Sequence, residues 1–242
     1  MAENGMDHAS EKGYGQWHRR VFEGNAALFA IGATIAILIG GIVEIVPMFT
    51  PAGPEHSEAI TPYTPLEVAG RDIYISEGCY LCHSQWVRPM RAEILRYGPW
   101  SRAWEYQYDR PFQLGSRRIG PDLHRIGNKY PDAWHYEHMR DPRSTTPGSV
   151  MPPYPWLLNG RIDAADVRAS VVALRKTGTP YSDAEIAGVE ESLTLQGGEI
   201  VSRLAGAGIE TTPDRKIVAL IAYLQRLGVE GKAALQAEGA EY

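Results

Sequence analysis

Two cysteines and a histidine stand close together in a segment suited to covalent attachment of a cofactor. The segment is Cys79-Tyr80-Leu81-Cys82-His83, and it contains both cysteines of the 242-residue chain. Cys-x-x-Cys-His is the pattern at which c-type haem is attached. Two thiols at this spacing reach the two vinyl groups of one haem, and the next residue then lies under the iron. The sequence therefore predicts one covalently bound haem c, held by Cys79 and Cys82, with His83 on the iron.

Two other kinds of site also use a Cys-x-x-Cys pair. A thiol–disulfide exchange site is expected in a thioredoxin-like βαβ setting, and no strand pattern surrounds Cys79. A structural zinc site needs further cysteines, and the chain has none. Haem attachment is therefore the preferred interpretation of the pair.

The second iron ligand has to come from another part of the chain. The candidate side chains are Met90, Met139, Met151, His124, His135 and His138. Met151 precedes Pro152 and Pro153, and prolines restrict the conformations of such a loop. A methionine ligand would also raise the haem potential. We predict Met151, with a histidine ligand or an open site as the alternatives. His135 and His138 are interpreted as hydrogen-bonded or packing residues.

The segment around Pro121 is expected to orient the haem. Pro121 has no N–H but keeps a carbonyl, and a ligating histidine needs an acceptor for its other ring nitrogen. We predict that the Pro121 carbonyl serves His83, with an ordinary turn as the alternative. Arg118 and Arg125 are candidates for pairing with haem propionates, because a guanidinium matches a carboxylate. A solvated basic patch that also includes Arg117 is the alternative.

An apolar stretch near the N-terminus predicts a membrane anchor. Residues 26–43 carry no charge, and about 18 such residues suffice to span a bilayer. A signal peptide would have a shorter apolar core and a cleavage site of small residues. Lys12, His18, Arg19 and Arg20 precede the stretch, and no Lys or Arg follows it before Arg71. This bias predicts a single span of the bacterial inner membrane, with the N-terminus cytoplasmic and the haem domain periplasmic.

The remaining chain is predicted to be mainly α. We divide it into a cytoplasmic segment (1–25), a transmembrane anchor (26–49), a linker (50–65), a periplasmic mono-haem cytochrome c domain (66–228) and a tail (229–242). Helices are predicted over residues 66–77, 133–140 and 163–176, from residue 182 onward, and over residues 212–227. Thr64 and Glu67 predict a capping box for the first of these. Residues 88–128 are interpreted as mainly ordered loop, and the tail from Glu230 as frayed. The net charge of −5 argues against nucleic acid as a partner.

Several stretches together resemble one known family, the membrane-anchored mono-haem cytochrome c subunit (subunit II) of cbb3-type cytochrome c oxidases. They are residues 40–47 (GGIVEIVP), 77–85 (EGCYLCHSQ), 87–89 (VRP), 108–112 (YDRPF), 115–118 (GSRR), 120–123 (GPDL), 134–135 (WH) and 151–157 (MPPYPWL). One departure is Trp104, which stands where that family usually has glycine, and this puts the local backbone geometry in question.

The resemblance implies a class I cytochrome c fold with a long loop insertion. It carries His83 and Met151 over as axial ligands, and it implies that Gly70 faces an aromatic residue such as Tyr223 where two helices cross. The implied role is transfer of electrons from a dihaem cytochrome c subunit to the catalytic haem–copper subunit, which reduces oxygen and pumps protons. The chain itself would only transfer electrons within this proton-translocating oxidoreductase. The insertion over residues 88–120 is expected to contact other subunits.

Two other functions remain as alternatives. The small subunit of nitric oxide reductase also has one anchor and one c-type haem, although the aromatic insertion argues against it. A haem-based sensor would need an open sixth position, and Met151 on its proline-rich loop argues against one.

Overall fold

The computed structural model of the chain describes residues 18–46, 56–237 and 239. It consists of two compact units, Met1–Glu55 and His56–Tyr242. Predictions for Lys12, for most of the linker and for the end of the tail lie outside the described residues. The regular structure of the described residues is helical, and one isolated β-bridge joins Arg161 and Arg215. The expected mainly α architecture is therefore confirmed.

The first unit contains one long apolar helix. A π-helical turn, η1 (Arg19–Glu23), precedes α2 (Ala26–Ile45). The Asn25 side chain caps α2 by accepting a hydrogen bond from the Leu28 amide, which satisfies one of the free N–H groups at the helix start. An 18-residue window of α2 has a mean hydropathy of 2.5, and no residue of the helix is buried within the unit. At about 1.5 Å per residue the helix is long enough to cross the hydrocarbon core of a bilayer.

The described residues of the second unit form helices and the loops between them. In chain order its elements are α3 (Pro65–Ser76), η3 (Cys79–Leu81), α4 (Arg91–Tyr97), η4 (Ala103–Tyr106), α5 (Asp132–Arg140), α6 (Pro142–Thr145), α7 (Trp156–Asn159), α8 (Ala164–Lys176), α9 (Asp183–Ala187), α10 (Val189–Gly206), α11 (Lys216–Arg226) and α12 (Val229–Ala237). The expected capping box at the start of α3 is present, with Thr64 and Glu67 each bonded to the other's backbone N–H.

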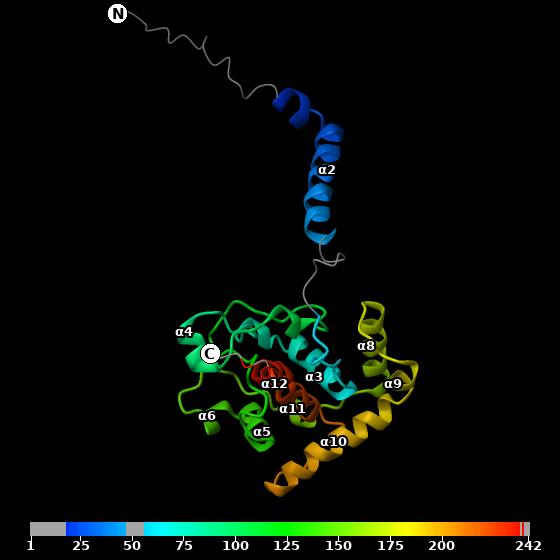
Figure 1. The fold of residues 1–242 in the computed structure, drawn as a ribbon. Coiled ribbons are helices and arrows are strands. Elements are labelled where there is room, and N and C mark those ends of the chain that lie inside the picture. The colour runs from blue at the N-terminus through cyan, green and yellow to red at the C-terminus, as the bar shows by residue number, and fades with distance from the viewer. Residues whose placement is uncertain (1–17, 47–55, 238, 240–242) are drawn as a thin grey trace, which may run out of the picture. The chain divides into compact units, whose positions relative to one another are not determined.

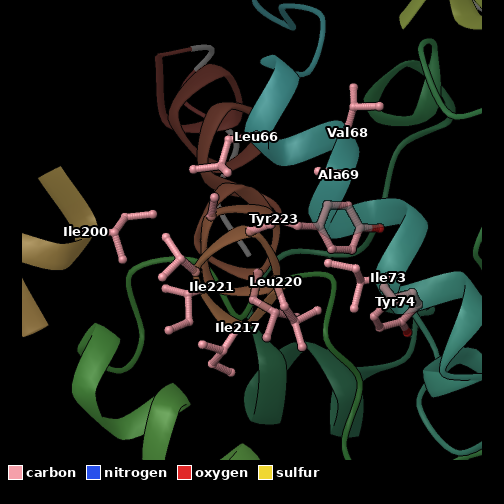
Figure 2. Packing of buried hydrophobic residues seen from close by; sticks show 14 of the residues in the cluster. Leu66, Val68, Ala69, Ile73, Tyr74, Ile200, Ile217, Leu220, Ile221 and Tyr223 are labelled. Carbon is pink, nitrogen blue, oxygen red and sulfur yellow. The ribbon is translucent and has the colours of Figure 1, made fainter. Parts of the chain in front are cut away.

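Helices α3 and α11 cross at the centre of this unit (Figure 1). Gly70 permits the close approach, because a Cβ atom there would lie 2.0 Å from the Ala219 carbonyl oxygen and 2.7 Å from the Tyr223 Cβ. Figure 2 shows Leu220 and Tyr223 of α11 among the buried side chains of α3. The predicted contact between Gly70 and Tyr223 is thus confirmed.

Residues 88–128 are mainly loop, as predicted, but they also contain two short helices that were not predicted, α4 and the 3₁₀ helix η4. These elements have seven and four residues, too few to show a clear apolar period. The tail is not frayed from Glu230, because α12 continues to Ala237 and buries Leu235. Glu230 itself accepts hydrogen bonds from the amide and hydroxyl of Thr61, which ties the helix to the start of the unit.

The C-terminal half also differs in its helix boundaries. The helix that opens at Ser182 breaks at Gly188, so that α9 and α10 are separate elements. The last core helix, α11, begins at Lys216 rather than at residue 212. At residue 104 the tryptophan lies in η4 with an ordinary backbone, since Asn128 is the non-glycine residue with positive φ among those described. The departure from the family pattern at Trp104 therefore causes no strain.

Candidate haem site

A cavity of about 560 Å³ lies beside the crossing of α3 and α11. Its walls come from the end of α3, from η3, from α5 and from the loops around residues 120 and 150. This volume is within the range of small-molecule and cofactor sites. The predicted site residues that line it are Cys79, Cys82, His83, Pro121 and Met151. The fold thus brings together residues that are up to 72 positions apart in the sequence.

A tight turn places the two cysteines and the histidine on one wall. Helix α3 ends at Ser76, and Gly78 follows in the left-handed region with φ +71°. This conformation is the one that glycine adopts at low cost. The chain then forms η3, and the His83 amide donates a hydrogen bond to the Cys79 carbonyl at 2.9 Å. The turn therefore presents Cys79, Cys82 and His83 to the same cavity.

The ring of His83 is held by the backbone at Pro121. Its Nδ1 lies 2.8 Å from the Pro121 carbonyl oxygen. A carbonyl oxygen only accepts, so Nδ1 carries the hydrogen and Nε2 keeps its lone pair for a metal. Gly120 allows this contact, because a Cβ there would lie 2.2 Å from the Cε1 atom of the ring. Burial lowers the pKa of His83 more than the Pro121 bond raises it, which favours the neutral imidazole that binds iron.

The environment of the thiols argues against the two rival interpretations. Burial, with a smaller contribution from the charge of Glu77, raises the pKa of the Cys79 thiol to about 12. Reactive dithiol sites have lowered thiol pKa values. Within residues 18–46, 56–237 and 239, no three His, Cys, Asp or Glu side chains group closely enough to hold a metal ion. A zinc site therefore has no ligand set in this part of the chain.

Met151 lies on a loop that is anchored to α5. The Tyr154 amide donates a hydrogen bond to the Met139 carbonyl at 2.8 Å, and the Met151 amide donates to the Ser149 hydroxyl at 3.2 Å. Met151 is half-buried against the core and lines the cavity that His83 also lines. Met90 is largely exposed and is not part of the cavity wall. The structure thus leaves Met151 and Met139 as the thioethers at the cavity.

The two arginines predicted as propionate partners do not line the cavity. Arg118 donates hydrogen bonds to Glu93, to the Trp86 carbonyl and to Ser84. Arg125 pairs with Glu105, and both of these side chains are almost fully buried. These partners could not be predicted from the sequence, because the carboxylates belong to the insertion that we interpreted as mainly loop.

The cations that do line the cavity are Arg96 of α4 and Lys129. Sequence reasoning missed both. Arg96 stands on a helix that was not predicted, and Lys129 has no feature in the sequence that distinguishes it from a surface lysine.

The histidines of α5 also reach the cavity. His138 is hydrogen-bonded through Nδ1 to the Thr145 hydroxyl at 2.6 Å, and its ring stacks on Trp134. His135 is buried, with 2% of its surface exposed. His124, the remaining histidine candidate, is bonded to Glu105 and lies outside the cavity wall. Of the three, only His135 and His138 are therefore placed to contact a bound cofactor.

These residues fit a haem. The thiols, an oriented neutral imidazole and a thioether line one cavity, and apolar side chains such as Leu123, Ile126 and Leu220 complete its walls. A helical unit with this site and with crossed first and last core helices belongs to the class of cytochromes c.

The comparison with protein families specifies the member of that class. The family described as "Cytochrome C oxidase, mono-heme subunit/FixO" matches residues 18–230. The chain belongs to this family of mono-haem subunits of cytochrome c oxidase, an oxidoreductase complex. The expected resemblance is thereby confirmed. A search of curated proteins found no matching relative.

Proposed function

We propose that the chain is the electron-transfer subunit of a cbb3-type haem–copper oxidase. It accepts electrons from the dihaem cytochrome c subunit and passes them to the catalytic subunit, which reduces oxygen and pumps protons. Membership of the mono-haem subunit family and the single apolar helix α2 support this role. The chain itself catalyses no step beyond electron transfer.

In this proposal one haem c is bonded to Cys79 and Cys82, with His83 and Met151 as the axial ligands. The observation that carries it is the contact of His83 Nδ1 with the Pro121 carbonyl at 2.8 Å, in a cavity that the other three residues also line. This contact orients the imidazole and leaves Nε2 as the iron ligand.

The bound haem supplies the exchange of one electron, and the protein residues keep its surroundings constant. The backbone at Pro121 fixes His83, and the anchored loop of Met151 holds the second ligand. Leu123, Ile126 and Leu220 give the cavity an apolar lining, which favours burial of the apolar haem ring there. A closed site of this kind favours electron transfer over binding of oxygen or another small ligand.

We further propose that α2 spans the bacterial inner membrane with the N-terminus in the cytoplasm. The excess of Lys and Arg before the span supports this orientation, as does the attachment of c-type haem outside the cytoplasm. The insertion over residues 88–120 then contacts the catalytic subunit. Its exposed apolar side chains Met90, Leu95 and Phe112 support that contact, because exposed apolar groups are common at interfaces.

Purification through a tag on this chain tests the proposal. The chain should elute from solubilised membranes with an oxygen-reducing complex, and it should retain a haem stain under denaturing conditions. The Cys79→Ala/Cys82→Ala variant should lose the stain. Elution with a complex that reduces nitric oxide instead would favour the reductase subunit, and binding of carbon monoxide to the reduced chain would favour a sensor.

A further inference from the structure

The buried histidine of α5 has a polar atom that the protein leaves without a partner. His135 is 2% exposed, and its Nε2 makes no hydrogen bond to any described residue. Buried polar atoms are nearly always hydrogen-bonded, so an exception calls for an explanation such as a bound group. The residue lines the haem cavity, and its ring is held edge-on against Tyr130 and Trp134.

Other unpartnered buried atoms are explained by their neighbours or lie elsewhere. Arg71 Nε and Asp109 Oδ1 face each other at 3.7 Å, away from the cavity wall. Tyr74 does line the cavity. Burial raises the pKa of the Tyr74 hydroxyl, but the neighbouring Gln85 side chain partly offsets that rise. A protein partner is thus close to Tyr74, whereas no such hydrogen-bonding neighbour affects His135.

The charges of the cavity wall favour an anionic ligand group. Lys129 and Arg96 line it, and neither forms an ion pair with a described residue. Asp122 is the acidic residue among the described wall residues. Its carboxylate is already engaged by the Ser84 hydroxyl and by the amides of Trp86 and His124. The wall therefore offers donors and positive charge with no free carboxylate to match them.

We propose that the Nε2–H group of His135 donates a hydrogen bond to a haem propionate. This inference rests on the proposed function, because it requires haem in the cavity. The propionates are the anionic groups of haem, and a donor within a desolvated wall suits an ionised carboxylate. Helix α5 then positions the polar edge of the cofactor, while η3 holds its covalently attached edge.

The protonation state of His135 agrees with this role. Burial lowers the pKa of its imidazole to about 4, so the ring is neutral at pH 7 and has one N–H to donate. The groups whose charges act on its pKa are Asp132, which raises it, and His138, which lowers it, both on α5. Arg203 of α10 pairs with the Asp132 carboxylate at 2.6 Å, and α11 adds the neutral Gln225 amide at 2.7 Å.

The test uses the full-length chain, purified in detergent with its haem labelled with ¹³C at the propionate carboxyls. His135→Phe removes the donor and keeps a ring. His135→Gln places an amide N–H near the position of Nε2. His135→Asn also has an amide N–H, but its side chain is too short to reach that position. His56→Phe is the matched control, since that histidine is exposed and lies outside the cavity wall. The readouts are the labelled carboxylate band in the reduced-minus-oxidised infrared spectrum and the pH dependence of the potential.

We expect His135→Phe to shift the labelled carboxylate band. The pH at which the reduction potential changes should also rise by about one unit, because an ionised propionate that loses its hydrogen-bond donor has a higher pKa. His135→Gln should restore both properties and His56→Phe should leave them unchanged. If His135→Phe retains no haem, His135→Asn should show the same shifts. An unchanged band and pH dependence in His135→Phe or His135→Asn would overturn the inference. A wild-type chain without covalent haem would overturn the proposed function as well, which separates the two failures.

Discussion

At the scale of single residues, the site depends on one ring whose position is set by a glycine. Gly120 has an ordinary backbone conformation, so Gly120→Ala acts only through its new methyl group, which would lie 2.2 Å from Cε1 of His83. The ring must turn away and lose its bond to Pro121, so we expect less haem per chain and a weaker bond from His83 to the iron. The haem stain and the optical spectrum measure both effects. Gly198→Ala is the control, because a Cβ there meets nothing within 4 Å.

A second prediction at this scale concerns Glu105. Burial alone would raise its pKa, but hydrogen bonds from Arg125 and His124 outweigh burial and lower the pKa from 4.5 to about 2. The folded-state pKa is thus below the unfolded one. The pair therefore stabilises the fold fully above pH 4.5 and loses its contribution as the pH falls toward 2. We expect Glu105→Gln to cost about 3 kcal/mol at pH 7, because it leaves Arg125 buried without its partner.

Denaturant unfolding between pH 7 and pH 3 measures this effect. The difference in the free energy of unfolding between the wild type and Glu105→Gln should shrink as the pH falls. Asp183→Asn is the control, because Asp183 also pairs with an arginine but is 94% exposed, and exposed pairs contribute little. A constant difference at all pH values would show that Glu105 acts through packing rather than through its charge.

The residues of the site differ in how well the sequence predicted them. Cys79, Cys82, His83 and Pro121, which line one cavity, could be selected from the sequence because local spacing or the chemistry of proline suggests a role for them. The contacts of Arg118 and Arg125 depend on Glu93 and Glu105, which come from an insertion with no periodic pattern. Pairing across such an insertion is a property of the fold, so local sequence could not show that these arginines do not line the cavity.

At the scale of helices, the crossing of α3 and α11 supports the cavity. Gly70→Ala would place a methyl group 2.0 Å from the Ala219 carbonyl oxygen and would force the two helices apart. We expect this overpacking to lower the free energy of unfolding by about 3 kcal/mol. The higher helix propensity of alanine would offset only about 1 kcal/mol of that loss. The melting temperature should fall by roughly 5–10 °C. Thermal unfolding in detergent measures this, and Gly206→Ala, which meets nothing within 4 Å, should not lower it.

The helices were predicted well where a cap and an apolar period coincide. Thr64 and Glu67 begin α3 as expected, and the apolar face of α11 was identified from its spacing. The missed elements, α4 and α12, are short or follow directly on another helix. Their stability comes from contacts with distant residues, such as the bonds of Glu230 to Thr61, and these cannot be inferred from a local pattern.

At the scale of the whole molecule, the proposal requires that α2 holds the chain in a bilayer. Ile35→Arg/Leu38→Arg places two charges near the middle of this helix, within an 18-residue window of mean hydropathy 2.5. Each arginine there costs about 3 kcal/mol on insertion scales, so we expect the variant to be released from membranes by alkaline carbonate. Leu195→Arg is the control, since Leu195 is equally exposed but lies in the second unit. Release of the wild-type chain under the same treatment would contradict a spanning helix.

The central claim is that Met151 completes a closed, electron-transferring haem site with His83. The most direct test is the optical spectrum of the oxidised full-length chain beside its Met151→Ala variant, with Met90→Ala as the control at a methionine outside the cavity. We expect the weak far-red charge-transfer band of a methionine–ferric haem bond in the wild type and in Met90→Ala, and its loss in Met151→Ala. Absence of the band from the wild type, or its persistence in Met151→Ala, would contradict the claim.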